Sequence, residues 1–182
     1  MKRNRWLLLS LAVGLVVAGC VLTSGQIRIS FDLDDFSTTT DTGLAAQTID
    51  LNTESEYKDN KDKLKDLSDL AVLGEITNNL GSPIDVEIWM TPTITNYTTA
   101  AEVTNSGSGA VRVWGPFNLA GNATKKIGWD DSAKLFSAAG KKLLLDEAKG
   151  DGQFQLYAIA PAGAYDFGVA KGVLVLVLDV GI

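Results

Sequence analysis

Histidine is absent from the sequence, and Cys20 is its only cysteine. Without histidine the chain lacks the commonest general base and the commonest zinc ligand. With one cysteine it cannot form an internal disulfide, and modification of Cys20 would leave no free thiol. Serine–histidine–aspartate and cysteine–histidine catalysis are therefore excluded. The chemistry left open uses carboxylates, lysine, serine or tyrosine, or a hard cation held by oxygen ligands.

Acidic residues are missing from the first part of the chain. None precedes Asp32, whereas Lys2, Arg3 and Arg5 are basic. Removal of residues 1–19 would leave 13 basic and 22 acidic residues, a net charge of −9. Because an anionic domain repels phosphate backbones and anionic lipid surfaces, nucleic-acid binding is not expected. Membrane attachment, if present, has to be covalent.

The N-terminus has the pattern of an export signal. A basic start at residues 1–5 is followed by 14 residues, Trp6 to Gly19, whose only polar side chain is Ser10. This is the length of a signal-peptide apolar region, since a membrane-spanning helix needs about 20 residues. The run Val17-Ala18-Gly19-Cys20 then resembles, at all four positions, the lipobox of bacterial lipoproteins.

The resemblance implies a lipid anchor. In that family a diacylglyceryl group is attached to the cysteine sulfur, the signal is cleaved before the cysteine, and the new amino group is often acylated. Residues 1–19 would then be a signal peptide, 20–25 a lipidated N-terminus and short tether, and 26–182 the exported domain. Each buried methylene adds about 0.8 kcal/mol of membrane affinity, so several acyl chains anchor durably. In many members of the family from bacteria with two membranes, an aspartate directly after the cysteine is associated with retention in the inner membrane. This chain has Val21 at that position, which favours the outer membrane in such a bacterium.

The exported part is patterned mainly as β-strands. Alternation of apolar and polar residues predicts strands at Ile27 to Leu33, Gln47 to Asn52 and Ile84 to Met90. Further strands are expected near Ala71 to Thr77, Ala101 to Thr104, Ala110 to Trp114 and Gln153 to Ala160. The apolar run Gly172 to Leu178 predicts a strand buried on both sides. Ser37 to Gly43 is polar and threonine-rich, and is expected to form a turn.

Two segments have helical patterns. Thr53 and Glu56 have the spacing of a capping box, and Leu64 and Leu67 continue one narrow apolar stripe, so a helix is expected over Glu54 to Leu70. A second helix would be capped by Asp130 or Asp131 and weakened in its middle by Gly140. The set favours one β-sandwich of about seven or eight strands with two inserted helices. The alternative is an α+β fold, an antiparallel sheet with helices on one face.

The acidic run Asp32, Asp34 and Asp35 is the candidate metal site. Asp32 and Asp34 would point the same way from one strand, and calcium takes oxygen ligands. A loop such as Ser37 to Asp41 would have to fold over them. The alternative interpretation is a solvated strand face whose carboxylates discourage aggregation.

Three tryptophans, Trp89, Trp114 and Trp129, are candidates for stacking on sugar rings. Trp89 is the most suggestive, since it lies opposite the apolar face of its strand. A sandwich also buries most of its tryptophans, so packing in the core or an interface is the alternative.

The resemblance and the composition favour a non-enzymatic structural or accessory lipoprotein with an envelope protein as partner. A ligand-binding lipoprotein for glycan or calcium is the first alternative. A carboxylate-dependent hydrolase comes third, because glycoside hydrolysis needs two carboxyls on either side of a bond. The adjacent pairs Asp130/Asp131 and Asp146/Glu147 do not face each other on a helix, so no catalytic residue is expected among them.

Overall fold

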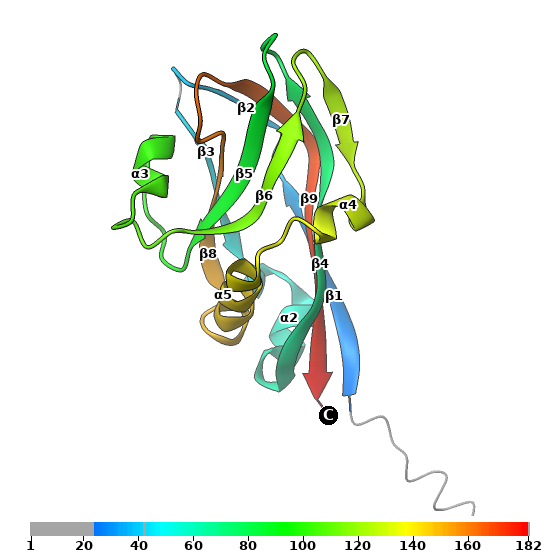
Figure 1. Ribbon diagram of the computed structural model, residues 1–182. Coiled ribbons are helices and arrows are strands. Elements are labelled where there is room, and N and C mark those ends of the chain that lie inside the picture. Colours follow the sequence, from blue (N-terminus) through cyan, green and yellow to red (C-terminus); the bar gives the residue numbers. More distant parts are fainter. Residues whose placement is uncertain (1–23, 42, 182) are drawn as a thin grey trace, which may run out of the picture.

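A computed structural model describes residues 24–41 and 43–181. Two antiparallel sheets pack against one another around a common core (Figure 1). The first sheet contains, in spatial order, β1 (Ser24–Leu33), β9 (Asp166–Gly181), β4 (Leu64–Asn78) and β7 (Thr124–Ile127), and β2 (Phe36–Thr39) pairs with the first residues of β9. The second sheet contains β3 (Ala45–Asp50), β8 (Gln153–Ile159), β5 (Ile84–Thr91) and β6 (Val111–Leu119). The predicted β-sandwich is confirmed, with nine strands in the described residues, and the α+β alternative is wrong.

The strand pairs are nested in the sequence. β1 pairs with β9, β3 with β8, β4 with β7 and β5 with β6, all antiparallel. Such nesting results when one long antiparallel ribbon folds over on itself, which is the arrangement of a jelly roll. The described residues by themselves contain paired strands in both sheets and a common core, which is what an independently folding domain requires.

Short helices cover parts of both sheets (Figure 1). α2 (Ser55–Asn60) stands between two 3₁₀ turns, η1 (Leu51–Thr53) and η2 (Lys61–Lys63). α4 (Trp129–Ala133) packs on β4, and α5 (Ala138–Lys149) packs mainly on β6. α3 (Ala100–Thr104) contributes Val103 to a second apolar cluster with Tyr157 and Ile159 on the outer face of the second sheet. In the described residues no helix is both long and apolar enough to cross a membrane.

The predicted helix over Glu54 to Leu70 is wrong in its second half, where the chain forms β4. Leu64, Leu67 and Leu70 pair with Val180, Leu178 and Leu176, successive core-facing residues of β9. Register shifts between Leu64 and Asp66 and between Leu67 and Asp69 each add one residue to β4. These bulges place residues three apart on the same face, and that spacing imitates a helix.

Other predicted elements also need correction. Ala101 to Thr104, predicted as an edge strand, is α3, and Ser37 to Thr39 of the predicted turn belong to β2. The predicted second helix is divided into α4 and α5. Asp130 and Asp131 lie in the first turn of α4, whose N-cap is Gly128, and Ser137 caps α5 by accepting the Gly140 N–H at 2.9 Å.

The apolar run Gly172 to Leu178 forms the centre of β9, between β1 and β4. Leu174, Leu176 and Leu178 face the core. On the opposite face Val175 is fully buried and Val177 is half-buried. The prediction of a strand buried on both sides is therefore confirmed at its centre.

Candidate functional site

A cavity of about 120 Å³ lies between the two sheets. Its wall takes residues from both sheets, including Val72 and Ile76 of β4, Ile88 of β5, Trp114 of β6 and Leu156 of β8. Small residues lie among them, namely Ala45, Gly74 and Ala158. Because side chains of this size fill little of the space between two sheets, the interior is left open at this level.

The cavity coincides with a bend in the first sheet. β1 pairs with β9 as far as Leu33 and Gly172, and β2 resumes the pairing at Phe36 and Val169. On the other side of β9, the register with β4 shifts between Leu73 and Glu75. Three neighbouring strands are therefore interrupted at one level. Bulges of this kind bend a sheet.

Two backbone conformations maintain this bend. Gly74 has φ 148° and Lys171 has φ 53°. A Cβ at Gly74 would lie in a tight contact, 3.2 Å from the Ala170 carbonyl oxygen, and the positive φ would add strain for any residue with a side chain. Asp35 accepts the Lys171 backbone N–H at 2.7 Å and so connects the junction of β1 and β2 to the bulge in β9.

Asp34 and Gln47 provide the polar side chains of the cavity wall. Asp34 and the neighbouring Ala46 are exposed, so the cavity reaches the surface between the β1–β2 junction and β3. The Gln47 side-chain amide donates to the Asp32 carbonyl oxygen at 3.4 Å and thereby bridges the two sides of this opening. The interior is apolar and the mouth is polar, as in small-molecule sites generally.

The three predicted carboxylates have different surroundings. Asp32 is exposed on β1, Asp34 lies at the cavity mouth, and Asp35 is engaged by the backbone of Lys171. Among the described residues no group of three potential ligands is placed to hold a metal ion. Ser37 to Thr39, which were expected to fold over the carboxylates, are instead fixed in β2 by pairing with β9.

The three predicted tryptophans lie in three different places. Trp114 is fully buried in the core, where its indole N–H donates to Ser132 Oγ at 3.0 Å, and its ring lines the cavity. Trp129, on α4, donates to Asp69 Oδ2 at 2.9 Å, and the Arg28 guanidinium lies 5.9 Å from the centre of its ring. Trp89 is half-buried against the apolar cluster beneath α3. They therefore do not form a joint stacking surface.

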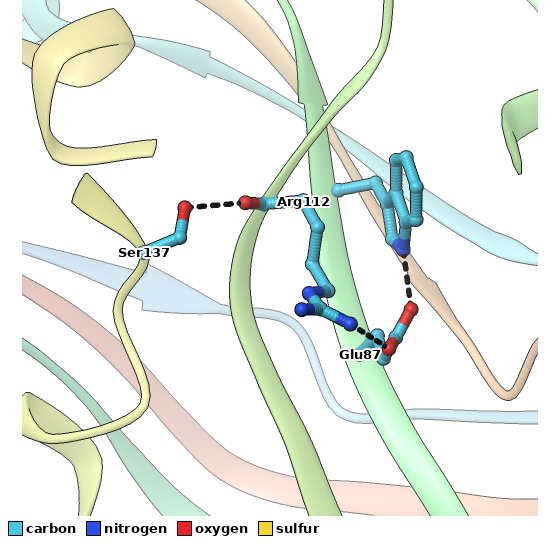
Figure 2. Close-up of polar contacts among 4 residues, drawn as sticks. Glu87, Arg112 and Ser137 are labelled. Carbon is cyan, nitrogen blue, oxygen red and sulfur yellow. Dashed lines mark hydrogen bonds and ion pairs between the residues drawn. The ribbon is translucent and has the colours of Figure 1, made fainter. Parts of the chain in front are cut away.

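Glu87 forms a polar network on the outer face of β5. Its Oε1 accepts Arg112 Nη1 at 2.6 Å and its Oε2 accepts Trp89 Nε1 at 2.8 Å (Figure 2). Ser137 Oγ donates to the Arg112 carbonyl oxygen at 2.7 Å, which attaches the start of α5 to β6. Both carboxylate oxygens of Glu87 therefore accept a hydrogen bond, so its buried charge is paired within the sheet.

The adjacent carboxylate pairs have structural surroundings. Asp146 accepts Lys142 Nζ at 2.5 Å in an exposed pair one helical turn apart. Burial, followed by the negative charges of Asp151 and Asp146, raises the pKa of Glu147. Asp130 and Asp131, in the first turn of α4, complement the positive end of the helix.

The cavity is the feature that sequence reasoning missed. The polar break at Asp34 and Asp35 and the glycine Gly74 are visible in the sequence, but their alignment depends on the strand register. Predictions for residues 1–23, including the signal peptide and lipidation at Cys20, lie outside the described residues.

No known protein family and no curated protein sequence matches the chain. Among solved structures, a chain from Desmodium yellow mottle tymovirus is similar, with 13% identity and a TM-score of 0.34, over 87% of this chain and 88% of that one. A chain from turnip yellow mosaic virus shows 13% identity and a TM-score of 0.35 over 87% and 80%. A chain from infectious bursal disease virus shows 12% identity and a TM-score of 0.32 over 85% of this chain and 32% of that one. Similarity at this level supports no inference about function.

Proposed function

We propose that this chain is a lipid-anchored bacterial envelope protein, held in the membrane through Cys20, whose β-sandwich serves as a non-enzymatic accessory or interaction domain. In a bacterium with two membranes, the outer membrane is the proposed location. The observation that carries the proposal is the agreement of basic start, apolar region and lipobox directly ahead of the folded domain. β1 begins at Ser24, four residues after Cys20.

The position of Ser24 is compatible with such an anchor. Ser24 pairs with Gly181 at the end of the sandwich where β9 finishes and α2 lies (Figure 1). Four extended residues span at most about 14 Å, so acylation at Cys20 would hold this end of the sandwich close to the bilayer. The opposite end, with the turn between β4 and β5, would face away from the membrane.

The non-enzymatic part of the proposal is supported by composition and by the surroundings of the carboxylates. The absence of histidine and the single cysteine remove the commonest catalytic residues. Glu87, Asp146 and Asp35 each have a structural partner. Calcium binding and glycan binding stay predictions from the sequence, and neither has a specific geometric argument among the described residues.

Metabolic labelling with palmitate tests the anchor, using the full chain and Cys20→Ala, with Ser24→Ala as the matched control. We expect label and membrane retention with the wild type and with Ser24→Ala, and no label with Cys20→Ala. Cross-linking of the lipidated protein in its own membranes, followed by purification, then tests the accessory role. A stoichiometric partner that requires lipidation supports it. Identical labelling of Cys20→Ala and the wild type would show that residue 20 does not carry the lipid.

A further inference from the structure

We propose that the cavity between the two sheets is a binding site for the apolar part of a small amphiphile whose head is neutral or positively charged. This goes beyond the proposed anchoring, and it depends on the described residues alone. The size of the cavity, its construction and the charge at its mouth together support the proposal.

The size and lining of the cavity favour an apolar occupant. A volume of about 120 Å³ is close to that of engineered apolar cavities of about 150 Å³, which stay dry and bind benzene or xenon. A buried water needs two to four polar partners. Throughout the described residues every buried side-chain nitrogen or oxygen already has a hydrogen-bond partner, so the cavity interior presents no unsatisfied side chain to water. Trp114 and the aliphatic residues around it instead offer dispersion contacts to a hydrocarbon.

The cavity is built into the fold and is not a local packing fault. It requires interruptions in β1, β4 and β9 at one level, with positive φ at Gly74 and Lys171. It also requires small residues on the facing sheet, Ala45 on β3 and Ala158 on β8. An empty space of this size forgoes contacts that side chains of ordinary size would make, so an occupant would recover stability that the empty fold lacks.

The mouth selects the head group. Asp34 is exposed at the opening, and Asp32 and Asp35 lie beside it in the sequence. Lys171, whose N–H binds Asp35, directs its ammonium group to Glu75 Oε1 at 3.4 Å. A carboxylate head would meet the negative charge of Asp34, whereas an ammonium or hydroxyl head can bind Asp34 or the side-chain amide of Gln47. The expected class is therefore a short alkyl or aryl amine or alcohol.

Thermal unfolding of residues 21–182 with three probes of equal chain length, hexylamine, hexanol and hexanoate, tests the proposal. We expect hexylamine and hexanol to raise the melting temperature in a saturable manner, and hexanoate to do so only at distinctly higher concentration. Crystals of the same protein under xenon pressure should show xenon between the sheets, beside Trp114. Failure of all three probes together with the absence of xenon would overturn the proposal.

Cavity-filling variants locate the binding. Ala158→Leu places a larger side chain in the cavity, and Ala139→Leu makes the same change at an exposed position of α5. We expect hexylamine affinity to fall about tenfold or more in Ala158→Leu and to stay unchanged in Ala139→Leu. If Ala158→Leu does not fold, Ala45→Leu on the edge strand β3 replaces it.

Equal hexylamine affinity in the filled variant and the wild type would place the binding elsewhere and overturn the proposal. Equal binding of hexanoate and hexylamine would overturn the assignment of the head group. None of these outcomes depends on whether Cys20 is acylated.

Discussion

Glu87 and Arg112 form an ion pair on the outer face of β5. The two partners differ in how buried each is when the other is removed. The side chain of Glu87 is 7% exposed, whereas that of Arg112 is 43% exposed. Arg112→Met leaves a buried carboxylate with only the Trp89 indole N–H, while Glu87→Gln leaves a guanidinium that water can reach. We expect Arg112→Met to lower the free energy of unfolding by about 3 kcal/mol and Glu87→Gln by about 1 kcal/mol.

Urea unfolding of both variants measures this difference, with Lys142→Met as the control. Lys142 pairs with Asp146 on the surface, at side-chain exposures of 74% and 51%. Such pairs contribute about 0–1 kcal/mol, so the control is expected to change stability little. Equal losses in Arg112→Met and Glu87→Gln would contradict the view that the buried charge of Glu87 sets the cost.

Tyr57 makes stability depend on pH in the alkaline range. It is fully buried, and its hydroxyl donates to the Ala148 carbonyl oxygen at 2.9 Å. Burial, together with the negative charges of Asp151, Asp50 and Glu147, raises the pKa of Tyr57 from 10.0 to about 12. The folded state therefore keeps the proton where the unfolded state has lost it, so the contribution is complete below pH 10 and is lost as the pH rises from about 10 to 12.

The difference in unfolding free energy between the wild type and Tyr57→Phe isolates this contribution, because other groups titrate equally in both proteins. Near pH 8 we expect the wild type to be more stable by about 1 kcal/mol, the value of one hydrogen bond. Between pH 10 and 12 the difference should shrink and then change sign, by about 2–3 kcal/mol in total. A difference that stays constant from pH 8 to 12 would mean that the Tyr57 hydroxyl is not held protonated by the fold.

At the scale of the element, α5 shows how packing overrides helix propensity. Gly140 lies in its first turn, and a Cβ there would stand 2.5 Å from Val113 Cα of β6. In an exposed helix, replacing glycine by alanine stabilises by about 1 kcal/mol. Here the helix would have to move away from β6, so Gly140→Ala is expected to lower the free energy of unfolding by about 1–3 kcal/mol.

The control for this prediction is Ala139→Gly, one residue earlier on the exposed side of the same helix. Propensity alone governs that position, so a loss of about 1 kcal/mol is expected there. Chemical denaturation of both variants gives the two values. A stabilised Gly140→Ala would show that α5 can shift on β6 without cost, against the close approach described above.

The strands and helices also show how much of the secondary structure can be predicted from the sequence. The alternation in Ile27 to Leu33 and Ile84 to Met90 correctly predicted β1 and β5, since a strand with one wet face has no other period. The helix predicted over Glu54 to Leu70 is wrong in its second half because two bulges in β4 place the core-facing residues Leu64, Leu67 and Leu70 three apart. The bulges depend on the partner strand β9, which the local sequence does not reveal. The capping box that forms is Thr99 with Glu102, at the start of α3. In the predicted one, Thr53 Oγ instead donates to the Asp50 carbonyl oxygen.

At the scale of the whole molecule, the sandwich could be foreseen and the cavity could not. The number and spacing of strands limit the architecture, because each strand has an apolar face to cover. The cavity depends on bringing Asp34 of the β1–β2 junction, Gly74 of β4 and Lys171 of β9 to one level, which only the register determines. The register also decides the surroundings of the predicted carboxylates, since Lys171 of β9 engages Asp35 while Asp34 lies at the cavity mouth.

The nested topology sets the orientation that a lipid anchor would impose. Ser24 and the start of β4 lie at one end of the sandwich, and the turn after β4 lies at the other. The 15 residues of β4 span about 45 Å at 3.3 Å per residue.

With lipid on Cys20, a dye at Lys63→Cys should therefore transfer energy strongly to acceptors on vesicle lipids, and a dye at Ser82→Cys should transfer weakly. Both positions are exposed, and no other cysteine competes, since the Cys20 sulfur would be acylated. Equal transfer from both positions would mean that the sandwich lies flat on the membrane, and labelling of the unsubstituted protein would reveal a free Cys20 thiol and contradict the anchor itself.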